Sequence, residues 1–454
     1  MMKLAEAAAA LGAETIGGDV LFQAVNTDTR TIQPGDLFIA LRGEHFDGHV
    51  FVAEAAAKGA VAALVSEPVE TALPLLRVAD TRLALGQLGA AWRTRFAIPL
   101  IAVTGSNGKT TTKEMLAAIF ARRGPVLATQ GNLNNDIGVP LTLLRLRAEH
   151  RCAVIEMGAN HPGEIAYLSE LARPTVALIT NAAMAHLAGF GSLDEIARTK
   201  GGIYAGLAEQ GVGIVNADDA YAGFWRSLLG GRRCMTFGMR EQADVSVLTG
   251  SVQCQLGDEA IITAFQMRTP AGDIDVSFPL MGEHNVMNAL AAAAAALAAG
   301  ATLADVKNGL EAMQAVKGRL QVKKAGCGAR VIDDTYNANP PSLLAAINVL
   351  AGVAGRKVLV LGDMGELGDD APLFHRQVGE RARQAGIDKL YATGELSRDA
   401  VQAFGADGGH YANHDELIAA LAADLNAQTT VLVKGSRFMR MERVVEALVQ
   451  EKKV

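Results

Sequence analysis

The sequence predicts an α/β protein built from three domains, and three observations lead to this prediction. The chain has 454 residues, which at about 100 to 200 residues per domain is too long for one domain. Short apolar segments alternate with helical patterns in two separate regions, as in parallel βαβ units. Between those regions lies a segment whose period-2 alternation is typical of antiparallel strands. We therefore expect domains at residues 1–95, 96–316 and 317–454.

The composition is that of a folded globular chain. Hydrophobic residues make up 50% and charged residues 20%, so each domain can bury a core. The formal net charge of -6 argues against a protein whose main task is to neutralise nucleic-acid phosphates. The four cysteines form no CxxC pair, and no segment approaches the ~20 apolar residues of a membrane span. We expect a cytoplasmic monomer that binds no nucleic acid and has no membrane span.

The first region has the pattern of a small α/β domain. A short helical segment opens the chain, and the apolar segments LFIAL (37–41) and VAALV (61–65) are predicted strands. QPGD, RGE and FDGH supply turn residues between them.

The central region predicts a parallel sheet that continues into antiparallel strands. Its apolar strand candidates PLIAVTG, CAVIEMG, TVALITN and GVGIVNADD end in polar residues or glycine, and ligands of parallel sheets bind at such carboxyl ends. Residues 234–281 supply the antiparallel extension, and an alanine-rich helix follows at 288–299.

The third region repeats the alternation of strands and helices. ARVIDDTY, KVLVLGD, DKLYATG and TVLVKGS are predicted strands, with helices at 374–385 and 439–449. The pattern indicates a separate, Rossmann-like domain.

The strongest local signal is IAVTGSNGKTT (101–111), in which an apolar strand runs into a glycine turn and then a helix. Gly105 and Gly108 allow the backbone N–H groups to turn toward phosphate oxygens, Lys109 supplies a positive charge, and the Thr110 hydroxyl can ligate Mg2+. Ser106, Asn107 and Thr111 complete the loop. A Walker A motif would have glycine at position 103, where this chain has valine, so a generic kinase or GTPase is disfavoured. The alternative is a glycine turn with an exposed lysine; ATP binding fits the strand and helix better.

Two further residues at predicted strand ends are candidate metal ligands. Glu156 follows CAVI, and His186 lies just beyond ALITN. A glutamate there is often a solvated charge and a single histidine a structural residue, but their position beside the phosphate loop favours metal binding.

Several motifs along the chain resemble those of the Mur ligase family. They are GSNGKTT, EMGANHPGEI, AHLAGFGS, GEHNVMNALAA, KGRLQ and DDTYNANPPS, and the resemblance runs from TDTRTIQPGDLFIALRG to VKGSRFMRME, nearly the whole chain. Within the family it is greatest to the ligase that adds D-Ala-D-Ala to UDP-MurNAc-tripeptide. The resemblance therefore implies ATP-dependent amide bond formation through an acyl phosphate in peptidoglycan precursor synthesis, with ATP and two Mg2+ ions required.

The resemblance also implies roles for individual residues. Lys109 and Thr110 would hold ATP phosphates and Mg2+, Glu156 and His186 would bind metal, and Arg319 would reach the γ-phosphate. Asn285 and Asn288 would lie near the adenine, and Asp334, rather than Asp333, near the ribose. The UDP-sugar-peptide would contact Asp28, Arg30, Asn134 and Asn135.

Lys200 carries a prediction of its own. A predicted helix opens with a capping box at Ser192 and Glu195, and Lys200 lies on its apolar stripe, seven residues after Leu193. Burial lowers the pKa of a lysine and so raises the neutral fraction that reacts with carbon dioxide. The resemblance implies a carbamate on this lysine that would hold a second Mg2+. The alternative is a lysine that extends from the edge of the stripe into solvent.

Two other functions stay open at this point. One is another ATP-dependent ligase of the same superfamily, such as a different Mur enzyme or a folylpolyglutamate synthase. The other is a non-catalytic, nucleotide-dependent binding protein, although the presence of Glu156, His186 and Lys200 disfavours it.

Overall fold

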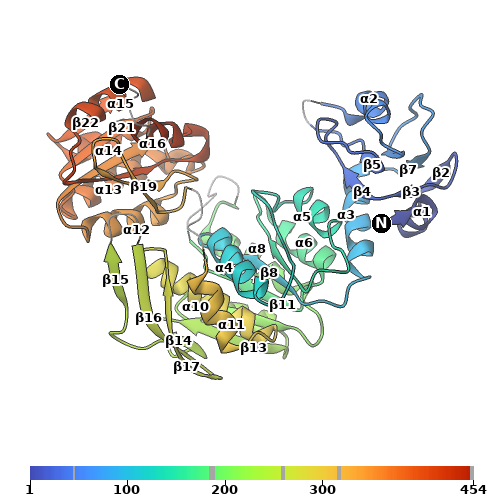
Figure 1. Ribbon diagram of the computed structural model, residues 1–454, viewed down its shortest axis with the longest axis horizontal. Coiled ribbons are helices and arrows are strands. Elements are labelled where there is room, and N and C mark those ends of the chain that lie inside the picture. The colour runs from blue at the N-terminus through green and yellow to red at the C-terminus, as the bar shows by residue number, and fades with distance from the viewer. Residues whose placement is uncertain (44–45, 184–189, 257–260, 314–317, 450–454) are drawn as a thin grey trace.

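The computed structural model describes residues 1–43, 46–183, 190–256, 261–313 and 318–449. It has three α/β parts arranged in a row, with the N-terminal and C-terminal parts on opposite sides of the central one (Figure 1). The predicted fold class, a small N-terminal α/β part, a central parallel sheet with an antiparallel extension and a Rossmann-like C-terminal part, is confirmed. The exact domain boundaries stay a prediction.

The N-terminal part contains a five-stranded sheet of order β2-β7-β6-β5-β4 and a two-stranded sheet of β1 and β3. Its elements are β1 (Met2–Lys3), α1 (Leu4–Leu11), β2 (Glu14–Ile16), β3 (Leu21–Phe22), β4 (Ala24–Asn26), β5 (Asp36–Ile39), η1 (Gly48–Phe51), α2 (Val52–Ala57), β6 (Ala62–Val65), β7 (Leu75–Arg77) and α3 (Thr81–Arg93). Helix α3 packs on α1 and also on α5 and α6 of the central part, so it joins the two parts.

The central part contains a ten-stranded sheet of order β15-β16-β14-β13-β12-β11-β8-β10-β9, with β17 paired to β16. Strands β9 to β14 run parallel with β8, and β15 to β17 form the predicted antiparallel extension. The elements are β8 (Leu100–Thr104), α4 (Lys109–Ala121), β9 (Val126–Ala128), α5 (Gly138–Leu143), β10 (Cys152–Glu156), α6 (Glu164–Ala172), β11 (Val176–Ile179), α8 (Leu193–Gly201), η2 (Gly202–Tyr204), β12 (Val212–Asn216), α9 (Ala222–Leu228), β13 (Arg233–Gly238), β14 (Val245–Val247), β15 (Gln253–Leu256), β16 (Ile261–Thr269), β17 (Gly272–Phe278), α10 (Glu283–Ala298) and α11 (Leu303–Glu311).

The C-terminal part contains a six-stranded sheet of order β18-β19-β23-β20-β21-β22, parallel except for β18. Its elements are β18 (Gln321–Lys324), β19 (Arg330–Asp334), α12 (Pro340–Ala351), β20 (Arg356–Gly362), η3 (Gly368–Asp370), α13 (Ala371–Gln384), β21 (Lys389–Thr393), α14 (Ser397–Phe404), β22 (Gly408–Tyr411), α15 (His414–Asp424), β23 (Thr429–Lys434), η4 (Arg437–Met439) and α16 (Glu442–Val449).

Several predicted element limits differ from the structure. The alanine-rich helix α10 begins at Glu283 rather than at 288, because polar residues at its start pack inward beside the phosphate loop. The predicted helix at 439–449 begins at Glu442, after a 3-10 turn and an αL residue at Arg440. Edge strands β9 and β22 were not predicted from the sequence, because three or four residues carry too little periodicity.

Candidate functional site

The site begins at the carboxyl end of β8, which lies between β10 and β11 in the central sheet. Val103 of β8 pairs with Glu156 of β10, and Thr104 pairs with Ile179 of β11. Because these strands are parallel, the phosphate loop, Glu156 and the segment after β11 emerge at one edge of the sheet. Helix α4 starts at Lys109, directly after the loop, so its first N–H groups face the same space.

At two positions of the loop, the backbone conformation and the close neighbouring atoms leave room only for glycine. Gly105 has φ +149°, and a Cβ there would lie 1.8 Å from Thr180 Oγ1. Gly108 has φ +81°, and a Cβ there would lie 2.2 Å from Asn288 Oδ1. The loop therefore needs glycine at both positions for backbone geometry and for close packing.

The backbone of the loop is held by the residues that follow β11. Asn181 accepts from Ser106 N with its carbonyl (2.9 Å) and from Asn107 N with its side-chain oxygen (3.0 Å). Thr180 Oγ1 donates to Asn107 O at 2.6 Å. Asn181, a polar residue at a strand end, thus positions the loop.

Lys109 folds back over the loop. Its Nζ donates to Gly105 O at 2.6 Å and to Ser106 O at 3.2 Å. Burial lowers the pKa of Lys109, the charge of Glu156 opposes that effect, and the charge of Arg319 adds to it. The ammonium therefore lies where the negative charge of a nucleotide's terminal phosphates would compensate its buried positive charge.

Arg319 and Thr110 are brought together from positions 209 residues apart. Arg319 Nη2 donates to Thr110 Oγ1 at 3.0 Å, and its guanidinium lies 4.4 Å from the centre of the Tyr336 ring. Within the described residues, its buried Nε has no hydrogen-bond partner. Arg319 thus presents an unused donor close to the phosphate loop.

Glu156 is 2% exposed, and its two carboxylate oxygens differ. Oε1 accepts from Asn134 Nδ2 at 2.9 Å, whereas the buried Oε2 has no partner among the described residues. A buried carboxylate oxygen without a donor is costly unless a cation compensates it. The residue therefore fits a Mg2+ ligand. The charge of Glu156 acts on Lys109, and the next residue, Thr110, offers a hydroxyl in the same loop.

Lys200 is 7% exposed, so the predicted burial is confirmed. Burial lowers its pKa well below the ordinary value, and the charge of Lys109 adds to that effect. The predicted capping box is half formed: Ser192 Oγ accepts from Glu195 N, but in the described part of the chain the Glu195 side chain returns no bond. His186, the other predicted metal ligand, lies outside the described residues.

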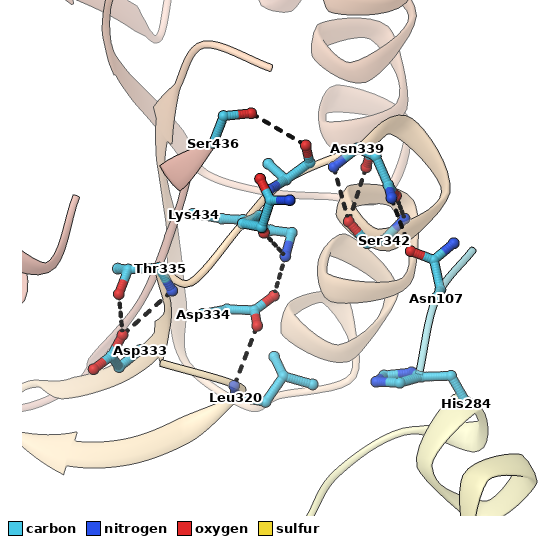
Figure 2. A network of polar contacts seen from close by, with 12 residues as sticks. Asn107, His284, Leu320, Asp333, Asp334, Thr335, Asn339, Ser342, Lys434 and Ser436 are labelled. Carbon is cyan, nitrogen blue, oxygen red and sulfur yellow. Dashed lines mark hydrogen bonds and ion pairs between the residues drawn. The ribbon is translucent and has the colours of Figure 1, made fainter. Parts of the chain in front are cut away.

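The predicted adenine and ribose residues are buried at the boundary of the central and C-terminal parts. Asn285 Nδ2 donates to Met281 O, and Asn288 Nδ2 donates to Asn285 Oδ1, so both stabilise the start of α10. Asp334 pairs with Lys434 (Oδ2 to Nζ, 2.6 Å) and accepts from Leu320 N, as Figure 2 shows. Asp333 binds Thr335 and Lys323 instead. The charge of Arg319, which donates to Thr110 of the central part, also acts on Asp334.

The predicted substrate residues fall into two groups. Asn135 Oδ1 accepts from Ile137 N and Gly138 N just before and at the start of α5, and Asn134 lies beside Glu156. The segment that carries Asp28 and Arg30 follows β4 in the N-terminal part, and Figure 1 shows β4 apart from β8 and α4, which flank the phosphate loop. Asp28 and Arg30 form an exposed ion pair (2.6 Å), and the hydrogen bond from Arg30 lowers the pKa of Asp28 to about 2. The structure therefore does not bring this pair to the phosphate loop.

Two polar contacts of the site were not predicted from the sequence. Asn339 Nδ2 donates to Asn107 Oδ1 across the boundary (2.8 Å), and Lys434 bridges Asp334 and Asn337 O. The YNANP motif contains Asn339, but no local pattern indicates a partner 232 residues away.

Three family models match consecutive parts of the chain. "Mur ligase family, catalytic domain" matches residues 21–119, "Mur ligase middle domain" matches 103–296, and "Mur ligase, glutamate ligase domain" matches 318–437. All three describe parts of one enzyme family, and together they span most of the chain.

Curated proteins and solved structures are similar over nearly the full length. The UDP-N-acetylmuramoyl-tripeptide--D-alanyl-D-alanine ligase of Escherichia coli (strain K12) is 48% identical over 440 residues, 96% of each chain. A crystal structure of MurF from Acinetobacter baumannii has a TM-score of 0.91 at 41% identity, covering 98% of both chains. MurF ligase from Thermotoga maritima, solved in complex with ADP, has a TM-score of 0.83 at 27% identity over 95% of this chain and 98% of its own.

Proposed function

Because the chain belongs to the Mur ligase family, we propose that it joins D-Ala-D-Ala to UDP-MurNAc-tripeptide, with ATP cleaved to ADP and phosphate. The observation that carries this proposal is the similarity to ligases of that name over 96% of the chain, N-terminal part included. The phosphate loop alone would support only nucleotide binding.

The chemistry requires activation of a carboxylate, because amide formation in water is uphill. The substrate carboxylate attacks the γ-phosphorus of ATP, which gives an acyl phosphate and ADP. In this proposal Lys109 and Arg319 stabilise the negative charge on the transferring phosphoryl group; Lys109 donates to the phosphate loop at Gly105, and Arg319 donates to Thr110 of the same loop. The amine of D-Ala-D-Ala then attacks the acyl carbon, and phosphate leaves.

The donor set also fits the metal that phosphoryl transfer needs. We propose that Thr110, Glu156, His186 and a carbamate on Lys200 hold Mg2+. The supporting observation is that Glu156 Oε2 is buried and has no partner within the described ranges. When bound, Mg2+ neutralises phosphate charge and orients the phosphoryl group. Lys200 is buried with a lowered pKa, the condition under which a lysine amine reacts with carbon dioxide.

The setting of the reaction follows from its substrates. None of the helices in the described ranges combines the length and hydropathy needed to cross a bilayer. We propose that the protein works in the cytoplasm, since ATP is a substrate and all four cysteines are free. We also propose that it works as a monomer.

One assay tests the function against its alternatives. Phosphate release is measured with ATP and UDP-MurNAc-tripeptide, with and without D-Ala-D-Ala, and product is identified by mass. Release that depends on both substrates, with the expected amide product, supports the proposal. Turnover only with another amino-acid acceptor would assign the chain to a different ligase of the superfamily, and no turnover with any acceptor would favour a nucleotide-dependent binding protein.

A further inference from the structure

We propose that Asn339 is a positioning residue that couples the C-terminal part to the phosphate loop through Asn107. Its side chain makes two connections at once, one to its own helix and one across the boundary between the parts. Figure 2 shows Asn339 between Ser342 on α12 and Asn107 on the loop. Only the predicted effect on ligation depends on the proposed function; the contact itself and its effect on nucleotide release do not.

On the C-terminal side, Asn339 is held by a capping box at the start of α12. Its Oδ1 accepts from Ser342 N at 2.9 Å, and its own N donates to Ser342 Oγ at 3.0 Å. Pro340 then begins the helix. Because the capping oxygen is committed to the helix, the amide nitrogen Nδ2 points outward in a fixed direction.

On the central side, Asn107 is equally constrained. Thr180 and Asn181 hold its backbone N and O, so the loop cannot turn the residue away. Its side-chain Oδ1 accepts from Asn339 Nδ2 at 2.8 Å. Each residue is therefore fixed by its own part of the chain, and the hydrogen bond between them reports the relative position of the two parts.

A second contact crosses the same boundary, but it involves a residue that we assign to nucleotide and metal binding. Arg319 donates to the hydroxyl of Thr110, a residue we assign to the nucleotide and its metal. That contact has to change when a nucleotide binds. Asn107 also belongs to the phosphate loop, but the loop is expected to bind phosphate through its backbone N–H groups and Lys109, which leaves the Asn107 side chain available to Asn339. The asparagine pair can therefore persist in the loaded enzyme and keep the C-terminal part against the nucleotide.

Loss of the pair should let the C-terminal part separate more often. Bound nucleotide would then leave sooner, and water could reach the acyl phosphate. Water attack on that intermediate regenerates the carboxylate and releases phosphate without an amide. The expected signature is faster nucleotide release together with more than one phosphate released per amide formed.

The variants separate this role from a structural one. Asn339→Ser keeps a good N-cap but cannot reach Asn107, and Asn107→Ala removes the partner without touching α12. Asn339→Asp keeps the cap, and the Asn107 amide can turn round to donate to it, although the carboxylate adds a negative charge near the phosphates. Adding Asn107→Ala should therefore accelerate release further in Asn339→Asp but not in Asn339→Ser.

The primary readout is the dissociation rate of a fluorescent ADP analogue, measured by stopped flow, which does not require ligation. Asn339→Ser and Asn107→Ala should each accelerate release about fivefold, which at 1.4 kcal/mol per tenfold corresponds to about 1 kcal/mol, the net value of one hydrogen bond. The double variant should be no faster than either single variant, and the melting temperature of Asn339→Ser should be unchanged.

The outcomes are distinguishable. The coupling would be overturned if the effects of the two single variants on the dissociation rate multiplied in the double variant. It would also be overturned if neither single variant changed the dissociation rate, or if a lower melting temperature accounted for the faster release. If the variants changed ADP release as expected but the unaltered enzyme formed no amide, the proposed function would be contradicted, while the coupling between Asn339 and Asn107 would still be supported.

Discussion

Lys200 has two properties at the scale of a single side chain that set it apart. It is almost completely buried, and the charge that acts on it among the described residues is the positive charge of Lys109. Lys113 is buried too, but its Nζ binds Glu114 and Thr129 O. Neutralising Lys200 as a carbamate anion beside Lys109 would remove the repulsion between the two ammonium groups.

Replacement of Lys200 by alanine should nearly abolish ligation, because the second metal would lose its ligand. Small carboxylic acids should partly restore activity by filling the space with a carboxylate. The direct check is 13C NMR with labelled carbon dioxide, in which a carbamate resonance should be present in the unaltered protein and absent in the variant. Lys58→Ala, at a surface pair with Glu54, is the control; an unchanged resonance in Lys200→Ala would refute the assignment.

Arg30 is the residue on which the predicted UDP site depends most. Its exposed pairing with Asp28 contributes little to stability, since surface ion pairs are worth about 0–1 kcal/mol. We expect Arg30→Ala to raise KM for the UDP-sugar-peptide several-fold while KM for ATP stays the same, because the residue lies far from the phosphate loop. Arg77→Ala, which breaks another surface pair of the N-terminal part, should change neither constant. A rise in KM for ATP alone would refute the role.

At the scale of elements, the phosphate loop shows how backbone geometry and packing act together. Gly108 has φ +81° and contacts Asn288, whereas Gly300 has φ +86° with no atom within 4 Å of an added Cβ. Both positions have the left-handed backbone conformation that favours glycine, but only Gly108 lies in the phosphate loop and would collide with a neighbour.

Replacing each glycine by alanine separates these effects. Both variants should lose about 1–2 kcal/mol of unfolding free energy from the left-handed conformation. Only Gly108→Ala should also lose ATP affinity, by at least about tenfold, because the collision displaces the loop or α10. Titration calorimetry together with denaturant unfolding measures both quantities, and equal ATP affinity in the two variants would show that the packing is irrelevant to binding.

At the scale of the whole molecule, the N-terminal and central parts share an apolar core, whereas the C-terminal part has cores of its own. One core runs from the N-terminal part through α3 into one face of the central sheet, including Leu88, Trp92 and Leu143. The C-terminal sheet has two cores of its own, and Met281 is the central-part residue within them. The first two parts should therefore behave as one unit, and the C-terminal part is the one able to move.

Because Asn107 and Asn339 already meet in this structure, we expect the free enzyme in solution to exchange between this arrangement and more open ones, and to become more compact on average when a nonhydrolysable ATP analogue and both substrates bind. Closure would shield the acyl phosphate from water. Small-angle scattering should give a smaller radius of gyration for the loaded enzyme than for the free enzyme, with the nucleotide alone as the comparison. An unchanged radius with all ligands at saturation would contradict closure.

Much of the fold and of the candidate site was predictable, because it depends on patterns of residues that are close in the sequence. The strand-loop-helix at 101–111 predicted the phosphate loop from residues close in sequence, and the apolar stripe of α8 predicted that Lys200 is buried. Short edge strands such as β9, and helix limits set by packing, were not predictable, because their few residues carry no period of their own.

The sequence by itself determined the three-part α/β architecture, the phosphate loop and the candidate ligand types, since periodicity, glycine positions and strand ends are local properties. Only the tertiary structure decided which side chains meet: Asn134 with Glu156, Arg319 with Thr110, and Asn339 with Asn107. The physical reason is that parallel strands distant in sequence end at a common edge, and domains dock through groups fixed independently in each part. Such contacts depend on where whole elements lie, which no short segment specifies.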